Sequence, residues 1–334
     1  MDFLSADSLP WLHGAQQRLR AALAAGRLPH SLLLLSAPGL GAEQLASWTA
    51  ALVLCESQDP RPCGVCPSCR LLRADSHPDA HVTRLEEDAQ QIKVEQVRDL
   101  IESLTLKSYR GGYKVGIIEG AEALNVNGAN AFLKTLEEPT ANTVLIMIAR
   151  PSHRLPATIA SRCLRLALQP PSTADAVAWL VAHSQITSTA GTADPRWEAA
   201  LALAGGAPLL ALELDTAGVA ALDQDMRESL RQLADASVDV TLLADRWMKS
   251  NPAWRLAWLE NWITQRVHAA LGTQVSGQSA EPVRLPAALL KAKIRALFEL
   301  LDAARDLRRL ASTGMNHQLA LEALLVGGRT ALAK

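Results

Sequence analysis

Short apolar runs alternate with stretches of helical periodicity through the first half of the chain. The apolar runs lie at residues 31–35, 80–85, 114–118, 144–148 and 163–168. Between most of them, apolar side chains recur at the i, i+3, i+4, i+7 spacing of an amphipathic helix, as at Val97, Leu100, Ile101 and Leu104. A second helix has the same spacing, at Ala129, Phe132, Leu133 and Leu136. Strands that alternate with helices predict an α/β fold, in which helices cover a parallel sheet.

The pattern changes at the pair Pro170-Pro171, after which strand signals disappear. The remaining residues read as helices, with a break at Gly205-Gly206 and an exposed polar loop at 272–281. Two apolar stripes are legible in this part, at Leu256, Leu259 and Ile263 and at Leu290, Ile294, Leu297 and Leu301. The second half is therefore expected to be all-helical.

A glycine-containing loop follows the first apolar run and reads Ser36-Ala37-Pro38-Gly39-Leu40-Gly41-Ala42-Glu43. Its position between a strand and a helix is that of a phosphate-binding loop, which uses a lysine and a Ser or Thr hydroxyl to hold phosphate and magnesium. Ala42 and Glu43 stand in those two places. A missing lysine forfeits on the order of 4 kcal/mol for a pair about 4 Å apart at an effective dielectric near 20. The loop is thus expected not to hold ATP, and an ordinary glycine turn is the alternative interpretation.

The run at 115–118 ends in Glu119-Gly120-Ala121-Glu122. An active ATPase of this class has Asp-Glu there, to hold magnesium and polarise water. In this chain Glu119 supplies one carboxylate and Gly120 has no side chain to activate water. Both nucleotide motifs are therefore degenerate.

Composition limits the location and the partners of the chain. Of 334 residues, 20% are charged and the formal net charge is -1, so no global basic field indicates nucleic-acid binding. The N-terminus lacks the basic and apolar regions of a secretory signal, and no run of eighteen apolar residues suggests a membrane span. We expect a cytoplasmic protein with no membrane contact, in which cysteines are reduced and clusters of them indicate metal.

Four of the five cysteines lie close together, at Cys55, Cys63, Cys66 and Cys69. Their spacing within a Pro- and Gly-containing loop is typical of four thiolates that wrap one zinc ion. A closed four-thiolate shell leaves no open position, so the predicted site is structural and not hydrolytic. A redox pair and an iron-sulfur cluster are the alternatives. His77 and His81 are near enough in sequence to substitute as ligands.

Two further motifs allow a family resemblance to be stated. Residues 130–139 read NAFLKTLEEP, and residues 155–163 end in Ser161-Arg162-Cys163. At these residues the chain closely resembles the bacterial clamp-loader proteins of DNA polymerase III, which belong to the AAA+ family. The degenerate phosphate loop is similar to that of the delta-prime branch and not to the ATP-hydrolysing gamma/tau branch. The resemblance extends to residues 27–30 and 316–319 and is weakest between 184 and 284.

The resemblance implies an AAA+ core at 1–168 with the zinc module inserted at about 55–70, a helical lid domain at 169–208 and a C-terminal helical collar at 209–334. It implies no ATP on this chain and a stator role in which Arg162 reaches into the ATP site of the adjacent subunit. The implied partners are the gamma/tau and delta subunits, the sliding clamp, and primed DNA through the assembled complex.

Other interpretations stay open at the level of sequence. The chain is alternatively a motor subunit in which Glu43 and Glu119 both bind magnesium, or a zinc-dependent DNA-binding module. Without the family, Arg162 is a solvated charge at a strand entry. The basic and aromatic strip at 107–114 is either a phosphate contact or an exposed turn. Glu137 and Glu138 end a helix, where they serve either a subunit contact or a solvated terminus.

Overall fold

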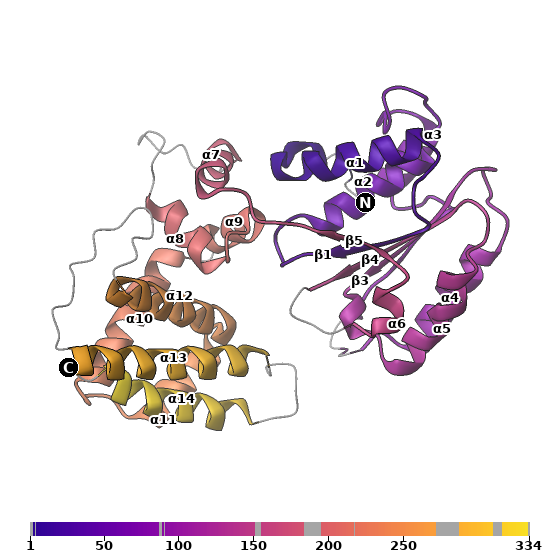
Figure 1. The fold of residues 1–334 in the computed structure, drawn as a ribbon. Coiled ribbons are helices and arrows are strands. Elements are labelled where there is room, and N and C mark those ends of the chain that lie inside the picture. Colours follow the sequence, from indigo (N-terminus) through magenta and orange to yellow (C-terminus); the bar gives the residue numbers. More distant parts are fainter. Residues whose placement is uncertain are drawn as a thin grey trace. The chain divides into compact units, whose positions relative to one another are not determined.

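A computed structural model describes residues 3, 5–86, 89, 91–150, 155–183, 195–216, 218–271, 287–309 and 316–332. The chain forms two compact units, Met1–Ser172 and Thr173–Lys334 (Figure 1). The first contains the sheet, and the described residues of the second are helical outside short turns. The predicted change from α/β to all-helical structure after the proline pair is confirmed.

The sheet of the first unit has five strands, all parallel, in the order β2-β3-β4-β1-β5. The strands are β1 (Ser31–Leu35), β2 (Ala80–Thr83), β3 (Lys114–Glu119), β4 (Thr143–Ala149) and β5 (Leu164–Ala167). Each lies on an apolar run predicted from the sequence. β1 pairs with β4 on one side, where Leu35 faces Ala149, and with β5 on the other, where Leu35 faces Ala167. The carboxyl ends of these strands therefore meet at one edge of the sheet.

Helices cover both faces of the sheet, with α1 and α2 on one face and α4 and α5 on the other (Figure 1). The α-helices of this unit are α1 (His13–Ala24), α2 (Ala42–Leu54), α3 (Pro67–Arg73), α4 (Val94–Thr105), α5 (Val126–Glu137) and α6 (Ala157–Ala160). Short 3-10 turns lie at Ser5–Ser8, Pro10–Leu12 and Ala121–Ala123. This two-sided cover explains why β1, β3 and β4 are almost continuously buried and apolar.

The predicted apolar stripes of α4 and α5 form the core beneath β3 and β4. Val97, Leu100 and Leu104 of α4 are buried, and so is Phe132 of α5. Each such side chain contributes about 1.5–3 kcal/mol through burial. Gly116 at the centre of β3 permits close approach of α4, because a Cβ there would lie 2.9 Å from Leu104 Cδ1.

The strip at 107–114 is a turn between α4 and β3, in which two of the basic residues, Arg110 and Lys114, make internal contacts. The Lys114 ammonium is buried and donates to the Leu104 and Leu106 carbonyl oxygens at the end of α4, the latter at 2.7 Å. Burial lowers its pKa. Arg110 pairs with Glu56 at 2.7 Å. Neither side chain is thus placed as a free phosphate contact, and the turn interpretation of the strip is favoured.

The second unit consists of helices packed on one another. They are α7 (Thr173–His183), α8 (Pro195–Leu203), α9 (Pro208–Thr216), α10 (Val219–Ala234), α11 (Val240–Lys249), α12 (Pro252–Leu271), α13 (Ala287–Arg309) and α14 (His317–Leu332). The predicted stripe on α12 is buried, and so are Leu297 and Leu301 on α13. The side chain of Leu290 and the polar segment 272–281 lie outside the described residues.

The sequence predicts no membrane-spanning segment. Within the described ranges, no single helix combines the length and apolar composition needed to cross a bilayer. The bent helix pair Trp197–Leu203 and Pro208–Leu214 meets these two requirements only when its helices are taken together.

Candidate functional site

The degenerate phosphate loop lies between β1 and α2, in the context that the sequence predicts. Gly39 and Gly41 have φ of +77° and +86°, which glycine adopts without strain, and Gly41 caps the start of α2. Ser36 is buried, and its hydroxyl donates to the Ala37 carbonyl oxygen at 2.9 Å. The loop therefore has the strand, glycine turn and helix arrangement that the sequence predicts.

The N-terminal segment packs directly on this loop, which sequence reasoning missed. Leu9 and Leu12 are buried, and a Cβ on Gly41 would lie 2.8 Å from Leu9 Cδ1. The Trp11 indole N–H donates to the Leu40 carbonyl oxygen at 2.9 Å. The only signal available was the apolar spacing of Leu9 and Leu12, which does not indicate what they cover. The glycine at position 41 is thus required by packing as well as by its positive φ.

Acidic side chains occupy the site where a nucleotide-binding core needs positive charge. Ala42 is buried at the start of α2, Glu43 is exposed in its first turn, and Glu119 ends β3. Burial raises the pKa of Glu119, the Arg84 guanidinium opposes this shift, and the charge of Glu43 adds to it. The negative charges of Glu43 and Glu119 therefore disfavour each other.

Two arginines neutralise carboxylates in this region, and neither was identified from the sequence as a partner. Arg84 Nε lies 3.5 Å from Glu119 Oε2. Arg150 Nε lies 3.3 Å from Glu122 Oε1, and its backbone N–H donates to the other oxygen of that carboxylate. Glu119 and Glu122, the carboxylates of the second motif, are thus each paired with an arginine of the same chain.

Arg162 lies at the amino ends of the strands, whereas the loop lies at their carboxyl ends. It immediately precedes Cys163 and β5, and its carbonyl oxygen accepts a hydrogen bond of 2.7 Å from the hydroxyl of Ser31, the first residue of β1. The loop begins after the last residue of β1. A five-residue parallel strand rises about 3.3 Å per residue, so the two edges are separated by roughly 15 Å. The arginine and the degenerate loop of one chain therefore cannot serve the same phosphate.

The Arg162 side chain is held by groups from two sequence motifs. Its Nη1 donates to the Thr158 carbonyl oxygen at 2.8 Å, and its Nη2 lies 2.5 Å from Glu137 Oε1 (the side chain is 35% exposed). Glu137 belongs to the motif at 130–139, so the structure joins both family motifs at one point. A guanidinium has five N–H donors, and these contacts leave several of them for another anion.

Ser161 and Cys163, on either side of Arg162, bond to the short helix α6. The Ser161 hydroxyl donates to the Thr158 carbonyl oxygen at 3.2 Å, and the Cys163 thiol donates to the Ile159 carbonyl oxygen at 3.2 Å. Burial raises the pKa of Cys163, which keeps it a thiol. Both side chains therefore fix the local backbone that presents Arg162.

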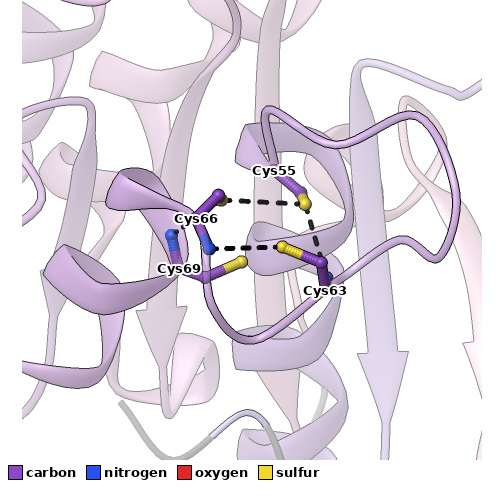
Figure 2. Close-up of side chains that lie close together, drawn as sticks. All are labelled: Cys55, Cys63, Cys66 and Cys69. Carbon is purple, nitrogen blue, oxygen red and sulfur yellow. Dashed lines mark hydrogen bonds between the residues drawn. The ribbon is translucent and has the colours of Figure 1, made fainter.

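The four predicted cysteines come together after the end of α2 and around the start of α3, as Figure 2 shows. The Sγ atoms of Cys55, Cys63, Cys66 and Cys69 lie within 4.8 Å of one another, and those of Cys55 and Cys66 are 3.9 Å apart. Tetrahedral zinc with bonds of about 2.3 Å places sulfurs about 3.8 Å apart. Within the described ranges, the histidines His77 and His81 are not part of this cluster. The donor set fits a metal ion.

Backbone N–H groups donate hydrogen bonds to three of the four sulfur atoms, and such bonds stabilise negative charge on sulfur. The amides of Cys63, Cys66 and Cys69 donate to the Sγ atoms of Cys55, Cys63 and Cys66, at 3.4, 3.3 and 3.4 Å respectively. Hydrogen bonds from the Val65 and Cys66 amides lower the pKa of the Cys63 thiol to about 6. Burial raises the pKa of the Cys55 and Cys69 thiols, which favours their neutral forms, whereas a bound cation would favour the thiolates.

A hydrogen-bond chain ties the cysteine cluster to the turn before β3. His77 and Ser68 are bonded at 3.2 Å, and the Ser68 hydroxyl donates to Glu56 Oε1, which also accepts from Arg110. The buried Asp79 carboxylate accepts the backbone N–H groups of residues 109 and 110. These groups line a cavity of about 220 Å³. His77 thus supports the cluster from outside it.

Comparisons with known proteins place the chain among replication proteins. The family model described as "DNA polymerase III, delta subunit" matches residues 12–172. The chain is 35% identical over 333 residues to DNA polymerase III subunit delta' of Pseudomonas aeruginosa, covering 96% of this chain and 97% of that one. It is 34% identical to the same subunit of Escherichia coli K12, covering 95% and 94%. A gamma subunit-related protein of Thermotoga maritima aligns with a TM-score of 0.48 at 16% identity, covering 91% and 95%.

The cysteine cluster predicts that Cys66→Ser lowers the metal content of the purified chain from about one equivalent. Serine keeps an acceptor for the Cys69 amide at the start of α3, so the change removes a metal ligand without removing the helix cap. Plasma mass spectrometry measures the content, and limited proteolysis at 55–70 should accelerate. Cys163→Ser, outside the cluster, is the matched control. Full metal retention by Cys66→Ser would overturn the four-thiolate assignment.

The raised pKa of Glu119 predicts a pH-dependent stability. Unfolded Glu119 ionises near pH 4.3 and the folded residue ionises at higher pH, so the free energy of unfolding falls as pH rises between those two values and is level above them. Glu119→Gln should remove that slope and be the more stable protein at neutral pH. Urea unfolding from pH 4 to 8 measures both effects, with Glu122→Gln as control. Parallel curves for Glu119→Gln and the unsubstituted chain would contradict the assignment.

Proposed function

The chain belongs to the DNA polymerase III delta-prime family of clamp-loader proteins, and we propose that it acts there as a stator that hydrolyses no ATP itself. In this role Arg162 enters the ATP site of a neighbouring subunit while the assembly loads a sliding clamp onto primed DNA. The observation that carries the proposal is the position of Arg162, at the sheet edge opposite to the loop of its own chain. From that end of the sheet, the Arg162 guanidinium would contact a phosphate bound to another subunit and not one bound at the loop of its own chain.

The proposed chemistry at Arg162 is stabilisation of charge on a transferring phosphoryl group. A guanidinium supplied in trans is worth about 10³ or more in turnover in related phosphoryl transfers, because it is rigid and always charged. Glu137 and the Thr158 carbonyl oxygen limit the motion of Arg162 without using all its donors. This pre-organisation supports a role in presenting the arginine to a partner.

The proposed inertness of the nucleotide site rests on charge and on packing. Ala42 and Glu43 replace the lysine and hydroxyl that hold phosphate and magnesium. Glu119 has Arg84 as its cation, and the N-terminal segment packs on Gly41. We therefore favour the stator over a motor subunit in which Glu43 and Glu119 hold magnesium.

The cysteine cluster is proposed to hold a structural zinc ion. Its four sulfurs lie within 4.8 Å of one another, and a tetrahedral shell made of them would leave no ligand position for water or substrate. Cys55, Cys63, Cys66 and Cys69 are the proposed ligands, and bound zinc would supply stability to the segment at 55–70 rather than chemistry.

The domain boundaries and partners follow from family membership as proposals. We propose an AAA+ core at 1–168, a lid at 169–208 and a collar at 209–334 that joins a ring of related subunits. The gamma/tau and delta subunits, the clamp and primed DNA are the proposed partners, and the cytoplasm is the proposed location.

Arg162→Ala is expected to leave assembly of the complex intact and to lower its DNA-stimulated ATP turnover. At the site that Arg162 serves, the loss should be on the order of 10³-fold. Folding should be little affected, since an exposed ion pair contributes under about 1 kcal/mol. Phosphate release from the reconstituted complex is the measurement, with Arg165→Ala on β5 as the exposed matched control. Unchanged turnover would refute the arginine role.

The isolated chain is expected to bind no ATP up to about millimolar concentration, because an absent lysine and an added carboxylate each cost on the order of 4 kcal/mol. Isothermal titration calorimetry with magnesium present tests this, and the assembled complex is the positive control. Micromolar affinity of the isolated chain would favour the motor subunit.

A further inference from the structure

Two tryptophans and two arginines form a stacked row on the second unit, unrelated to the role of Arg162. Trp258, Trp262 and Arg266 are four residues apart on α12 and therefore share one face. The ring centroids of the tryptophans are 6.2 Å apart at an interplanar angle of 18°. The Arg266 guanidinium carbon lies 4.5 Å from the Trp262 ring, and that of Arg227 from α10 lies 5.9 Å from the Trp258 ring.

This row borders a surface cavity of about 230 Å³ between α10 and α12. The cavity is lined by Arg227, Leu230, Arg231, Ala234, Trp262 and Arg266. Three arginine side chains thus line a small volume whose described lining residues include no carboxylate. An anion is the ligand that such a lining favours.

Two of these three arginines form ion pairs with carboxylates that lie outside the cavity lining. Asp223 lies 2.8 Å from Arg227 Nε and also accepts the Trp258 indole N–H, and Glu228 lies 2.8 Å from Arg231. Among the described residues, no carboxylate pairs with Arg266. Burial and the charge of Arg227 both lower the pKa of Arg266, which agrees with cations crowded at the cavity.

The stacking decides how Arg266 interacts with a ligand. A guanidinium that lies over an indole is attracted through its face, and its N–H donors project from its edge. Those in-plane donors match the oxygens of a phosphate. A tetrahedral phosphate has several oxygens that accept from more than one guanidinium at once, whereas a carboxylate has two in a single plane.

The position of Trp262 limits what else the cavity recognises. Trp258 precedes it by one turn and Arg266 follows by one turn, and both stack on its ring. A nucleobase therefore has little free indole surface on which to stack. Recognition would depend on the charged backbone, which carries no sequence information.

We propose that this cavity binds a backbone phosphate of nucleic acid, without sequence preference. Arg266 and Arg231 would donate to the phosphate oxygens, and the tryptophan row would hold Arg266 in place. The proposal is independent of ATP hydrolysis and goes beyond the proposed stator role.

Fluorescence anisotropy of a labelled oligothymidylate with the full chain tests the proposal. At about 50 mM salt we expect measurable binding, and Arg266→Gln should weaken it about three- to tenfold. Loss of one phosphate contact from a single strand should also reduce the slope of log affinity against log salt by about 0.7. Arg266→Lys, which keeps the charge and loses the planar fork, should give an intermediate affinity.

Arg295→Gln is the matched control, because it removes the same charge from an exposed residue of α13 that pairs with Glu299. It should leave the affinity unchanged, and circular dichroism should show both Gln variants folded. Equal losses in the two variants would overturn the proposal, because they would indicate only general charge. So would no binding by the unsubstituted chain, or tighter binding of polyglutamate than of the oligonucleotide, which would indicate an acidic protein partner instead.

Discussion

The parallel pairing of β1 with β4 and β5 is the constraint on which the rest of the structure depends. It sends the degenerate loop and Glu119 to the carboxyl edge of the sheet, while Arg162, which precedes β5, is fixed at the opposite edge by the Ser31 hydroxyl. Because strand direction is uniform, no side-chain rearrangement brings the arginine to its own loop. The separation between the degenerate loop and Arg162 is therefore a consequence of sheet topology.

Arginine side chains pair with the acidic residues that remain in the degenerate second motif. A nucleotide-binding core normally places a lysine and magnesium against its acidic residues, and both motifs here keep acids without the lysine. Arg84 and Arg150 take up Glu119 and Glu122 instead. Packing of Leu9 and Leu12 on Gly41 fixes the loop from the other side. The degenerate site thus contains internal ion pairs and apolar contacts.

The cysteine cluster is connected to the sheet through polar groups and not only through the chain. Ser68 and Glu56 link His77 to Arg110, and Asp79 holds the backbone of the same turn. The turn leads directly into β3, so these hydrogen bonds connect the cysteine cluster to the strand that ends at Glu119. The second unit contains none of the four clustered cysteines and has its own charged feature, the arginine and tryptophan row.

The sequence alone determined the five strands, the helical second half, the cysteine set and the degenerate state of both nucleotide motifs. These depend on local periodicity and on residue chemistry at fixed spacing, which the chain displays directly. Several contacts were decided only by tertiary structure: the Glu137–Arg162 ion pair, the Arg84–Glu119 pair, the N-terminal cover over Gly41, and the burial of Lys114. Each joins residues on different elements, and no periodic pattern encodes which charges or apolar faces meet. The sequence identified Arg162 as a candidate site residue, but the order and direction of the strands place it too far from the loop of its own chain to contact a phosphate there.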